Sequence, residues 1–246
     1  MTVVVTGGVK GIGLAIAERL ARPGEALILG YNADEEAATA AKAQLAPSGA
    51  IVTTVRADVG SIAGAQTLMD AVTGDDVVHI VHSAAMIYPT SLLDADLERF
   101  TQAIHVNGLS LLYLVQKGLP RLSRGSTVTF ITSAGARTTQ ANYAALGVGK
   151  ALAESLVRYL VAELAPRGIR INAVAPGLVD TTSVVGMVGS AEGAAKLLER
   201  AGRANPSGRL TEGRDYAAVV EFLQSPAAEF VQGQVIHVNG GAYVHG

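Results

Sequence analysis

Seven short apolar runs, separated by segments of helical periodicity, constrain the fold of this 246-residue chain more than any other feature. A short continuous apolar run is typical of a strand buried on both faces of a parallel sheet. Strands that alternate with helices predict right-handed crossovers and a doubly wound α/β sheet covered by helices on both faces. The runs cover residues 3–5, 26–29, 51–55, 77–81, 127–131, 169–174 and 235–238.

The segments between these runs predict the helices. Apolar positions recur at helical spacing from Ile12 to Ala21, and an Ala-rich segment extends to about Leu45. We expect two helices between Asp94 and Leu122 and one long helix from about Tyr143 to Leu164. No repeat, linker or low-complexity tract divides the sequence, so residues 1–246 are expected to form a single domain.

Composition argues against several kinds of partner and location. The formal net charge of -2, without basic or acidic bias, argues against a nucleic-acid partner. No apolar run reaches the roughly 18 residues of a membrane span. The first strand follows directly after Met1, which leaves no room for a signal peptide. Since the chain also lacks cysteine, we expect a cytoplasmic protein without disulfides or thiolate metal sites.

A glycine-rich loop from Thr6 to Gly13 joins the first strand to the first helix. Glycines allow a tight turn and close approach of a ligand to the backbone. The N-terminus of the following helix offers free N–H groups and a partial positive charge. In this context the loop predicts a site for the pyrophosphate of a dinucleotide.

A tyrosine and a lysine, Tyr143 and Lys150, lie seven positions apart. Because seven residues complete almost two helical turns, both side chains are expected on one helix face. A cation close to a phenol lowers its pKa, and such a pair can hold or donate a proton beside a substrate oxygen. A solvated lysine and a core tyrosine would show the same spacing.

The glycine loop reads Thr-Gly-x-x-x-Gly-x-Gly and, with further motifs along the whole chain, resembles the short-chain dehydrogenase/reductase family. Asn107 matches the family's helix asparagine that holds a proton-relay water, and Ser133 follows the fifth strand at the catalytic-serine position. The resemblance implies a Rossmann fold whose seven parallel strands have the order 3-2-1-4-5-6-7. It also implies a homotetramer.

The resemblance further implies a nicotinamide dinucleotide cofactor. In the family, a pair after the third strand contacts the adenine, a segment after the sixth strand clasps the nicotinamide, and the lysine holds the ribose. His82 and Ser83 replace two asparagines of the family, which leaves the support under the nicotinamide open. The residues expected to bind the cofactor are Thr6, Gly7, Lys10, Gly11, Ile12, Gly13, Tyr31, Asn32, Asp58, Val59, Ser83, Ala84, Ala85, Lys150, Pro176, Gly177, Val179 and Thr181.

The tyrosine is displaced relative to most members of the family. Ordinary members carry Tyr-x-x-x-Lys, but four residues before Lys150 this chain has Leu146, which cannot donate a hydrogen bond. Ser133 and Lys150 keep the family's separation of 17 positions, so the tyrosine itself has moved, by about 4.5 Å along a helix axis. Tyr-x6-Lys resembles the arrangement of enoyl-acyl-carrier-protein reductases.

Enoyl reduction gives this displacement a chemical reason. Hydride goes to the β-carbon, two atoms further from the thioester carbonyl than in ketone reduction, so the donor to the carbonyl oxygen must move too. Tyr143 is therefore expected to stabilise an enolate, with Lys150 lowering its pKa. Ser133 is expected to line the acyl site, although a strand-end serine can also cap its own backbone.

The sequence favours NADPH over NADH. NAD-specific folds usually place an acid at the end of the second strand, where this chain has Tyr31 and Asn32. The nearest acids, Asp34 and Glu35, fall at the expected helix cap. Lys10 is expected within reach of a 2′-phosphate, unless it is an ordinary solvated lysine.

Residues 182–209 match the family's mobile substrate loop. Val184, Val185, Met187 and Leu197 could cover an acyl chain or could form an ordinary packed lid. The five histidines show no metal-ligand spacing, so no metal is expected.

The sequence thus predicts an NADPH-dependent oxidoreductase that reduces a C=C bond conjugated to a carbonyl. An enoyl thioester on acyl carrier protein or CoA is the expected substrate, and Tyr143, Lys150, Ser133 and Asn107 are the expected catalytic residues. One alternative is a 3-oxoacyl or carbonyl reductase, or an alcohol dehydrogenase, with Tyr143 in an unusual pose. A more remote one is a cofactor-binding sensor or scaffold without activity.

Overall fold

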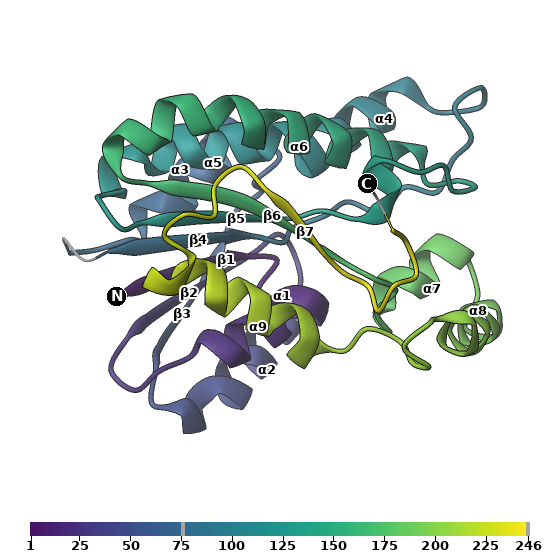
Figure 1. Cartoon of the computed structure of the whole chain (residues 1–246), viewed down its shortest axis with the longest axis horizontal. Coiled ribbons are helices and arrows are strands. Elements are labelled where there is room, and N and C mark those ends of the chain that lie inside the picture. The colour runs from purple at the N-terminus through teal and green to yellow at the C-terminus, as the bar shows by residue number, and fades with distance from the viewer. Residues whose placement is uncertain (75–76, 245–246) are drawn as a thin grey trace.

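A seven-stranded parallel sheet forms the centre of the computed structural model, which describes residues 1–74 and 77–244 (Figure 1). The strand order, β3-β2-β1-β4-β5-β6-β7, confirms the order expected from the sequence. The strands are β1 (Thr2–Thr6), β2 (Ala26–Tyr31), β3 (Ile51–Arg56), β4 (Val78–His82), β5 (Thr127–Ile131), β6 (Arg170–Pro176) and β7 (Val235–Val238).

Helices cover both faces of the sheet (Figure 1). One face packs against α1 (Gly11–Leu20), α2 (Glu35–Leu45) and α9 (Gly213–Gln224). The other face packs against α3 (Ile62–Asp70), α5 (Ser110–Gly118) and α6 (Ala144–Leu164).

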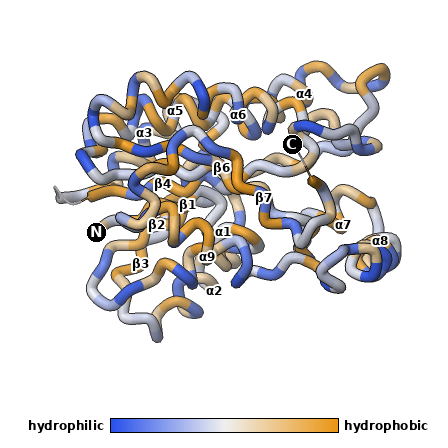
Figure 2. The backbone as a smooth tube through the Cα atoms, viewed as in Figure 1, coloured by the Kyte–Doolittle hydropathy of each residue, from blue (hydrophilic) through white to orange (hydrophobic). Residues whose placement is uncertain are grey.

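The central strands are buried along their length and mainly apolar because the sheet has a core on each side (Figure 2). Successive side chains of a strand point to opposite faces. In β1, Val4 therefore lies in the core with α3, α5 and α6, whereas Val3 and Val5 lie in the core with α1 and α9. This explains why a run of valines, rather than an alternating pattern, marks the first strand.

The helical region before β5 contains the two helices expected between Asp94 and Leu122, but no loop separates them. Its first helix, α4 (Leu97–Ile104), continues through a π-helical turn (His105–Leu109) directly into α5. Gly108 in this turn lies against α6, because a Cβ on Gly108 would be 2.8 Å from the carbonyl oxygen of Gly149. The wide turn thus brings α6 close to the segment that carries Asn107.

The expected substrate loop contains two helices, α7 (Thr182–Val188) and α8 (Ala191–Ala204). Gly189 separates them with a φ of +87°, a left-handed conformation that favours glycine. Within residues 1–74 and 77–244, no helix is both long and apolar enough to cross a lipid bilayer.

Candidate active site

A cavity of about 720 Å³ opens at the carboxyl ends of the strands, where ligands bind in doubly wound sheets. Its wall is formed by the segments that follow β1 to β6, together with parts of α4, α6, α7 and α8. Of the residues predicted from the sequence to form the site, all line this cavity except Thr6 and Asn107. The fold therefore gathers the predicted residues around one space.

The glycine-rich loop leaves its backbone accessible on one side of the cavity. Gly11 has a φ of +54°, which favours glycine. A Cβ on Gly13 would lie 2.2 Å from the carbonyl oxygen of Gly7, so a larger residue would displace the loop. Since α1 begins at Gly11, its free N–H groups lie beside the loop. This arrangement fits the pyrophosphate of a dinucleotide.

Lys10 forms an ion pair with Asp34 on the cavity wall. Lys10 Nζ lies 2.6 Å from Asp34 Oδ2. Asp34 Oδ1 accepts a hydrogen bond from the Ala37 N–H at 3.0 Å and caps α2, as the sequence predicts for this acid. The Lys10 hydrogen bond is the main cause that holds the pKa of Asp34 below its usual value. A 2′-phosphate would therefore meet a lysine that is already paired.

Thr6 does not line the cavity itself, but it holds two residues that form the cavity floor. Its Oγ1 accepts hydrogen bonds from the N–H groups of Ser83 and Ala84, at 3.1 and 3.0 Å. These residues follow β4, whereas Thr6 ends β1, so the hydroxyl joins the ends of two neighbouring strands. Thr6 thus supports two residues that line the cavity, and its predicted contact with the cofactor stays a prediction.

His82, which replaces the first asparagine of the family's pair, extends this hydrogen-bond network. Its Nδ1 lies 2.7 Å from Thr6 Oγ1, and its Nε2 lies 2.6 Å from Ser110 Oγ. Because Ser110 donates its own proton to the Val106 carbonyl, we assign the proton of His82 to Nε2 and the donor role of the other bond to Thr6. Burial, aided by the charge of Lys150, lowers the pKa of His82 to about 3, so the ring stays neutral near pH 7.

The long helix begins where the sequence predicts, within one residue of Tyr143. Tyr143 is the N-cap of α6, with φ -99° and ψ 0°, and the helix begins at Ala144. The preceding Asn142 has a φ of +58°, and its carbonyl accepts a hydrogen bond from the Thr90 N–H at 3.1 Å. The Tyr143 carbonyl still accepts the first bond of the helix, from the Gly147 N–H at 2.8 Å, and the side chains of Tyr143 and Lys150 line the same cavity.

The Tyr143 side chain is held at its ring and at its hydroxyl. The hydroxyl donates a hydrogen bond to Ser133 Oγ at 3.2 Å. The ring packs on Gly135, where a Cβ would lie 2.4 Å from Tyr143 Cε1. Ser133 and Gly135 belong to one short segment after β5, so that segment sets the position of the phenol.

The pKa of Tyr143 is raised, contrary to the sequence-based expectation. Burial is the largest cause, the hydrogen bond with Ser133 opposes it, and the charge of the Tyr243 phenol adds to it. The expected lowering by Lys150 is absent from these causes, because the Lys150 amine is directed elsewhere. At neutral pH, Tyr143 is a protonated phenol that can donate a hydrogen bond.

The Lys150 amine points towards the end of β5. Its Nζ donates a hydrogen bond to the Ile131 carbonyl at 2.7 Å and lies 4.4 Å from the centre of the Phe130 ring. Burial lowers the pKa of Lys150 to about 7. Lys150 and the glycine loop line the same cavity. The amine has N–H donors besides the one that Ile131 accepts, so a ribose hydroxyl in this cavity is a fitting acceptor.

Asn107 has a structural role, as one reading of the sequence indicates. Its Oδ1 accepts from the Met86 N–H at 2.8 Å, and its Nδ2 donates to the Met86 carbonyl at 3.0 Å and the Ala145 carbonyl at 3.4 Å. The fully buried amide thus fastens the π-helical turn to α6 and to the chain after β4. A relay water at Asn107 stays a prediction.

Apolar side chains form the remaining wall. Leu146, at the position of the ordinary tyrosine, is 6% exposed and lines the cavity. Val184, Met187 and Leu197 of the lid helices line it too, as one reading of the sequence predicts, whereas Val185 is partly exposed and is not part of the wall. No local motif indicated three further lining residues, which only the fold brings here: Ile87, Gln102 and Gln140.

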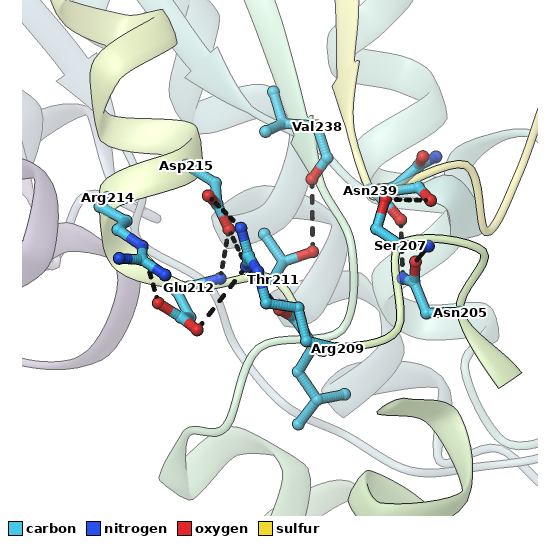
Figure 3. A network of polar contacts seen from close by, with 11 residues as sticks. Asn205, Ser207, Arg209, Thr211, Glu212, Arg214, Asp215, Val238 and Asn239 are labelled. Carbon is cyan, nitrogen blue, oxygen red and sulfur yellow. Dashed lines mark hydrogen bonds and ion pairs between the residues drawn. The ribbon is translucent and has the colours of Figure 1, made fainter. Parts of the chain in front are cut away.

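We call residues 182–209, which include α7 and α8, the lid. A polar network fastens the end of the lid to the start of α9 (Figure 3). Asn205 donates to the Asn239 carbonyl, and Ser207 donates to the Gly240 carbonyl, each at 2.9 Å. Arg209 then makes a bidentate pair with Asp215 in α9, at 2.6 and 2.8 Å. The end of the lid is thus tied both to the segment after β7 and to α9.

Asn239, which replaces the family's usual aspartate, organises the segment after β7. Its Oδ1 accepts from the Gly241 N–H, and its Nδ2 donates to the Tyr243 carbonyl, both at 2.9 Å. An aspartate could make only the first of these bonds, because a carboxylate has no N–H. The amide therefore fixes the turn that leads to Tyr243.

Within residues 1–74 and 77–244, no group of three or more histidine, aspartate or glutamate side chains could hold a metal ion. One of the five histidines considered from the sequence, His245, lies outside these residues.

Comparison with known proteins identifies relatives over nearly the whole chain. A family model described as enoyl-(acyl carrier protein) reductase matches residues 7–243. The 3-oxoacyl-[acyl-carrier-protein] reductase FabG of Haemophilus influenzae is 32% identical, over 98% of this chain and 97% of its own. The 1-cyclohexenylcarbonyl-CoA reductase of Streptomyces collinus is 29% identical, over 97% of this chain and 85% of its own.

A solved structure is similar to this protein in both fold and sequence. The crystal structure of a short-chain dehydrogenase from Burkholderia cenocepacia J2315 in complex with NADP has a TM-score of 0.85 and 28% identity, covering 98% of this chain and 97% of its own. Together with the strand order and the glycine loop, these matches identify the family of this protein. The chain belongs to the short-chain dehydrogenase/reductase family of NAD(P)-dependent oxidoreductases.

Proposed function

We propose that this protein is an NADPH-dependent reductase of a carbon–carbon double bond conjugated to a carbonyl. Its substrate would be an enoyl thioester carried by CoA or by acyl carrier protein. The observation that carries this proposal is the place of the phenol. Tyr143 presents its hydroxyl to Ser133 from the N-cap of α6, while Leu146 occupies the position of the ordinary tyrosine with a side chain that cannot donate a proton.

The protonation state of Tyr143 supports a role in reduction. When bound, the reduced nicotinamide supplies a hydride. Tyr143, protonated because burial raises its pKa, donates a hydrogen bond to the thioester carbonyl oxygen as negative charge develops there. Ser133 accepts that hydrogen bond in the free protein and orients the phenol. Alcohol oxidation would instead need a phenolate base, which a raised pKa disfavours.

Apolar side chains support an acyl substrate. Leu146, Ile87 and Met187 line the cavity that also contains Tyr143. The name of the Streptomyces collinus relative describes a CoA thioester whose carbonyl is conjugated to a ring double bond, which is the class proposed here. FabG of Haemophilus influenzae is named for a 3-oxoacyl substrate, so a ketoreductase is the second candidate function.

The wall near Lys10 supports NADPH. The chain has Tyr31 and Asn32 at the end of β2 rather than an acid, and Lys10 neutralises the nearest carboxylate, Asp34. Lys10 would exchange this partner for a 2′-phosphate, which accepts stronger charge-assisted hydrogen bonds than a ribose hydroxyl.

Tyr143→Phe tests the proposed reaction. The wild-type protein is expected to oxidise NADPH with crotonyl-CoA and not with acetoacetyl-CoA. Tyr143→Phe should lower kcat for crotonyl-CoA by about 100-fold or more, because it removes the donor to the enolate oxygen. Tyr159→Phe is the matched control, since Tyr159 lies on the same helix and is 76% exposed. Turnover of acetoacetyl-CoA alone would overturn the proposal.

Leu146→Tyr separates the two candidate functions. It restores a phenol where ordinary family members carry it. If the protein is an enoyl reductase, the bulkier side chain should reduce turnover of crotonyl-CoA, because it enters a filled wall. A gain in acetoacetyl-CoA reduction at least as large as that loss would favour the ketoreductase.

Lys10→Met tests the cofactor. The expected result is a rise in KM for NADPH of about 10-fold or more, with KM for NADH little changed, because only NADPH carries the phosphate. Equal effects on both cofactors would contradict the assigned role of Lys10.

A further inference from the structure

Glu154 is a buried acid on α6 that the reaction described above does not use. It is 3% exposed and lies one helical turn after Lys150. Burying a carboxylate is unfavourable unless other groups satisfy it. Glu154 Oε1 accepts a hydrogen bond from Thr132 Oγ1 at 2.8 Å, and Oε2 accepts one from Arg137 Nε at 2.9 Å. The arginine side chain is 40% exposed, so it joins the buried acid to the surface.

The two partners of Glu154 mark the ends of one short segment, residues 132–137. This segment contains the 3-10 turn Ala134–Ala136 and both groups that hold Tyr143. Ser133 accepts the hydrogen bond of the phenol, and Gly135 lies against its ring. The segment therefore connects the carboxylate of Glu154 to the position of Tyr143 without any direct contact between these two residues.

The first part of the segment is fixed independently of Glu154. Lys150 donates to the Ile131 carbonyl, and the Thr132 N–H donates to the Val174 carbonyl at 2.8 Å. Beyond Ser133, the backbone bonds at Arg137 and Thr138 lead back to Ala134, within the segment itself. The ion pair of Arg137 with Glu154 thus ties the far end of the segment to α6.

We infer that Glu154 is a positioning residue, which holds the segment 132–137 so that Ser133 and Gly135 place the Tyr143 phenol for reaction. The inference rests on the proposed role of Tyr143. A small displacement of a reacting group can lower a rate by about 100-fold. Glu154 is therefore expected to act on turnover rather than on cofactor binding, because none of the residues predicted to bind the cofactor lies in this segment.

Glu154→Gln is the most direct variant. The amide has nearly the same shape, and its oxygen still accepts from Thr132. The amide is neutral, however, so the ion pair with Arg137 is lost, and if the amide oxygen turns to Arg137 only a weaker, uncharged hydrogen bond replaces it. The expected result is a fall in kcat of about 10- to 100-fold, with KM for NADPH changed less than about 2-fold.

Val157→Ala is the matched control for stability. Val157 is fully buried on the same helix and packs in the core, away from the segment. This variant should lower the melting temperature while leaving kcat per folded protein unchanged. If Glu154→Gln likewise lowers only the melting temperature, Glu154 is structural and the inference is overturned.

Two further variants cover the case in which Glu154→Gln fails to fold. Arg137→Ala should lower kcat in the same direction, and Arg137→Lys should recover part of the loss because it restores a cation beside Glu154. No loss in Arg137→Ala, or no recovery in Arg137→Lys, would overturn the inference.

The inference and the proposed function can fail separately. If Tyr143→Phe keeps full activity, the role of Tyr143 fails, and with it the basis of the inference. If Tyr143→Phe is inactive while Glu154→Gln is fully active, only the inference fails. All variants are assayed with whichever thioester the wild-type protein reduces, so the comparison does not depend on the enoyl substrate.

Discussion

Two polar networks flank the cavity, and they differ in burial and in the kind of bond that joins them. Beneath the floor, Thr6, His82 and Ser110 are fully buried and are joined by hydrogen bonds between neutral groups. At the lid, Arg209 and Glu212 are about half exposed and are joined to α9 by ion pairs (Figure 3). The floor is therefore a fixed part of the site, whereas water and salt compete with the bonds that fasten the lid.

Replacing His82 should disrupt the buried hydrogen-bond network beneath the cavity. Of the changes considered, we expect it to lower the free energy of unfolding the most. In His82→Leu, the Thr6 hydroxyl loses its acceptor and Ser110 loses a donor, both in a buried place. Since an unsatisfied buried group costs about 1–3 kcal/mol, we expect the free energy of unfolding to fall by about 2–4 kcal/mol. Chemical denaturation measures this. A loss below about 1 kcal/mol would mean that the floor rearranges as easily as the lid.

A pH titration of stability sharpens the comparison, because the floor contains a histidine that stays neutral. The pKa of His82 is about 3 in the folded protein, against the ordinary histidine value of 6.5 in an unfolded chain. Below pH 6.5 the unfolded chain therefore binds a proton that the folded protein excludes. The stability present above about pH 6.5 should decline as pH falls towards about 3, by at most about 1.4 kcal/mol per pH unit for this one group.

His79 shares this acidic window, because burial lowers its pKa to about 4. The contribution of His82 is therefore the difference in slope between the wild-type protein and His82→Leu. Identical slopes in denaturation series at several pH values would show that His82 is protonated in the folded protein.

Breaking the lid network should have a smaller effect, and one that depends on salt. Arg209 lowers the pKa of Asp215 to about 2, mainly through their hydrogen bonds. Because the pair is partly exposed, Asp215→Asn should lower the melting temperature by only about 1–3 °C at low ionic strength. Calorimetry in about 1 M salt should show a smaller difference between the two proteins. A difference that salt does not change would place this pair with the buried network.

Asn239→Asp should give the smallest effect, confined to one segment. The variant keeps the bond to the Gly241 N–H and loses the bond to the Tyr243 carbonyl. We expect faster amide exchange in residues 241–244 and little change in global unfolding. Exchange that also accelerates in α6 would show that this segment supports the reaction centre.

The sequence predicted the sheet well because its signals are local. Buried parallel strands are continuous apolar runs, and the strand order followed from the resemblance to the family. The end of a helix is less well encoded. The start of α6 was predicted to within one residue, but not the left-handed Asn142 or its hydrogen bond to Thr90, which fix the backbone just before Tyr143. Such a boundary depends on a residue more than 50 positions away.

Charge and protonation were the least predictable part of the site. The spacing of Tyr143 and Lys150 suggested that the lysine lowers the pKa of the phenol, but the direction of the amine and the burial of the ring decide it. The sequence identified His82 as a departure from the family's asparagine but not its partners, which are 76 and 28 positions away. Side-chain partners at such distances are set by the fold rather than by a local motif.

The pairing of β1 with β4 has a consequence for folding during synthesis. The glycine loop is synthesised early, but the hydroxyl of Thr6 meets His82 only 76 positions later, after two complete strand–helix units have formed and β4 has inserted beside β1. Closing so long a stretch of chain is entropically costly, and pairing between distant strands is slow. A nascent chain that ends before β4 carries every glycine of the motif and Thr6, but neither His82 nor Ser110. We therefore expect the predicted cofactor site to assemble only after β4 has been synthesised, when about a third of the chain is complete.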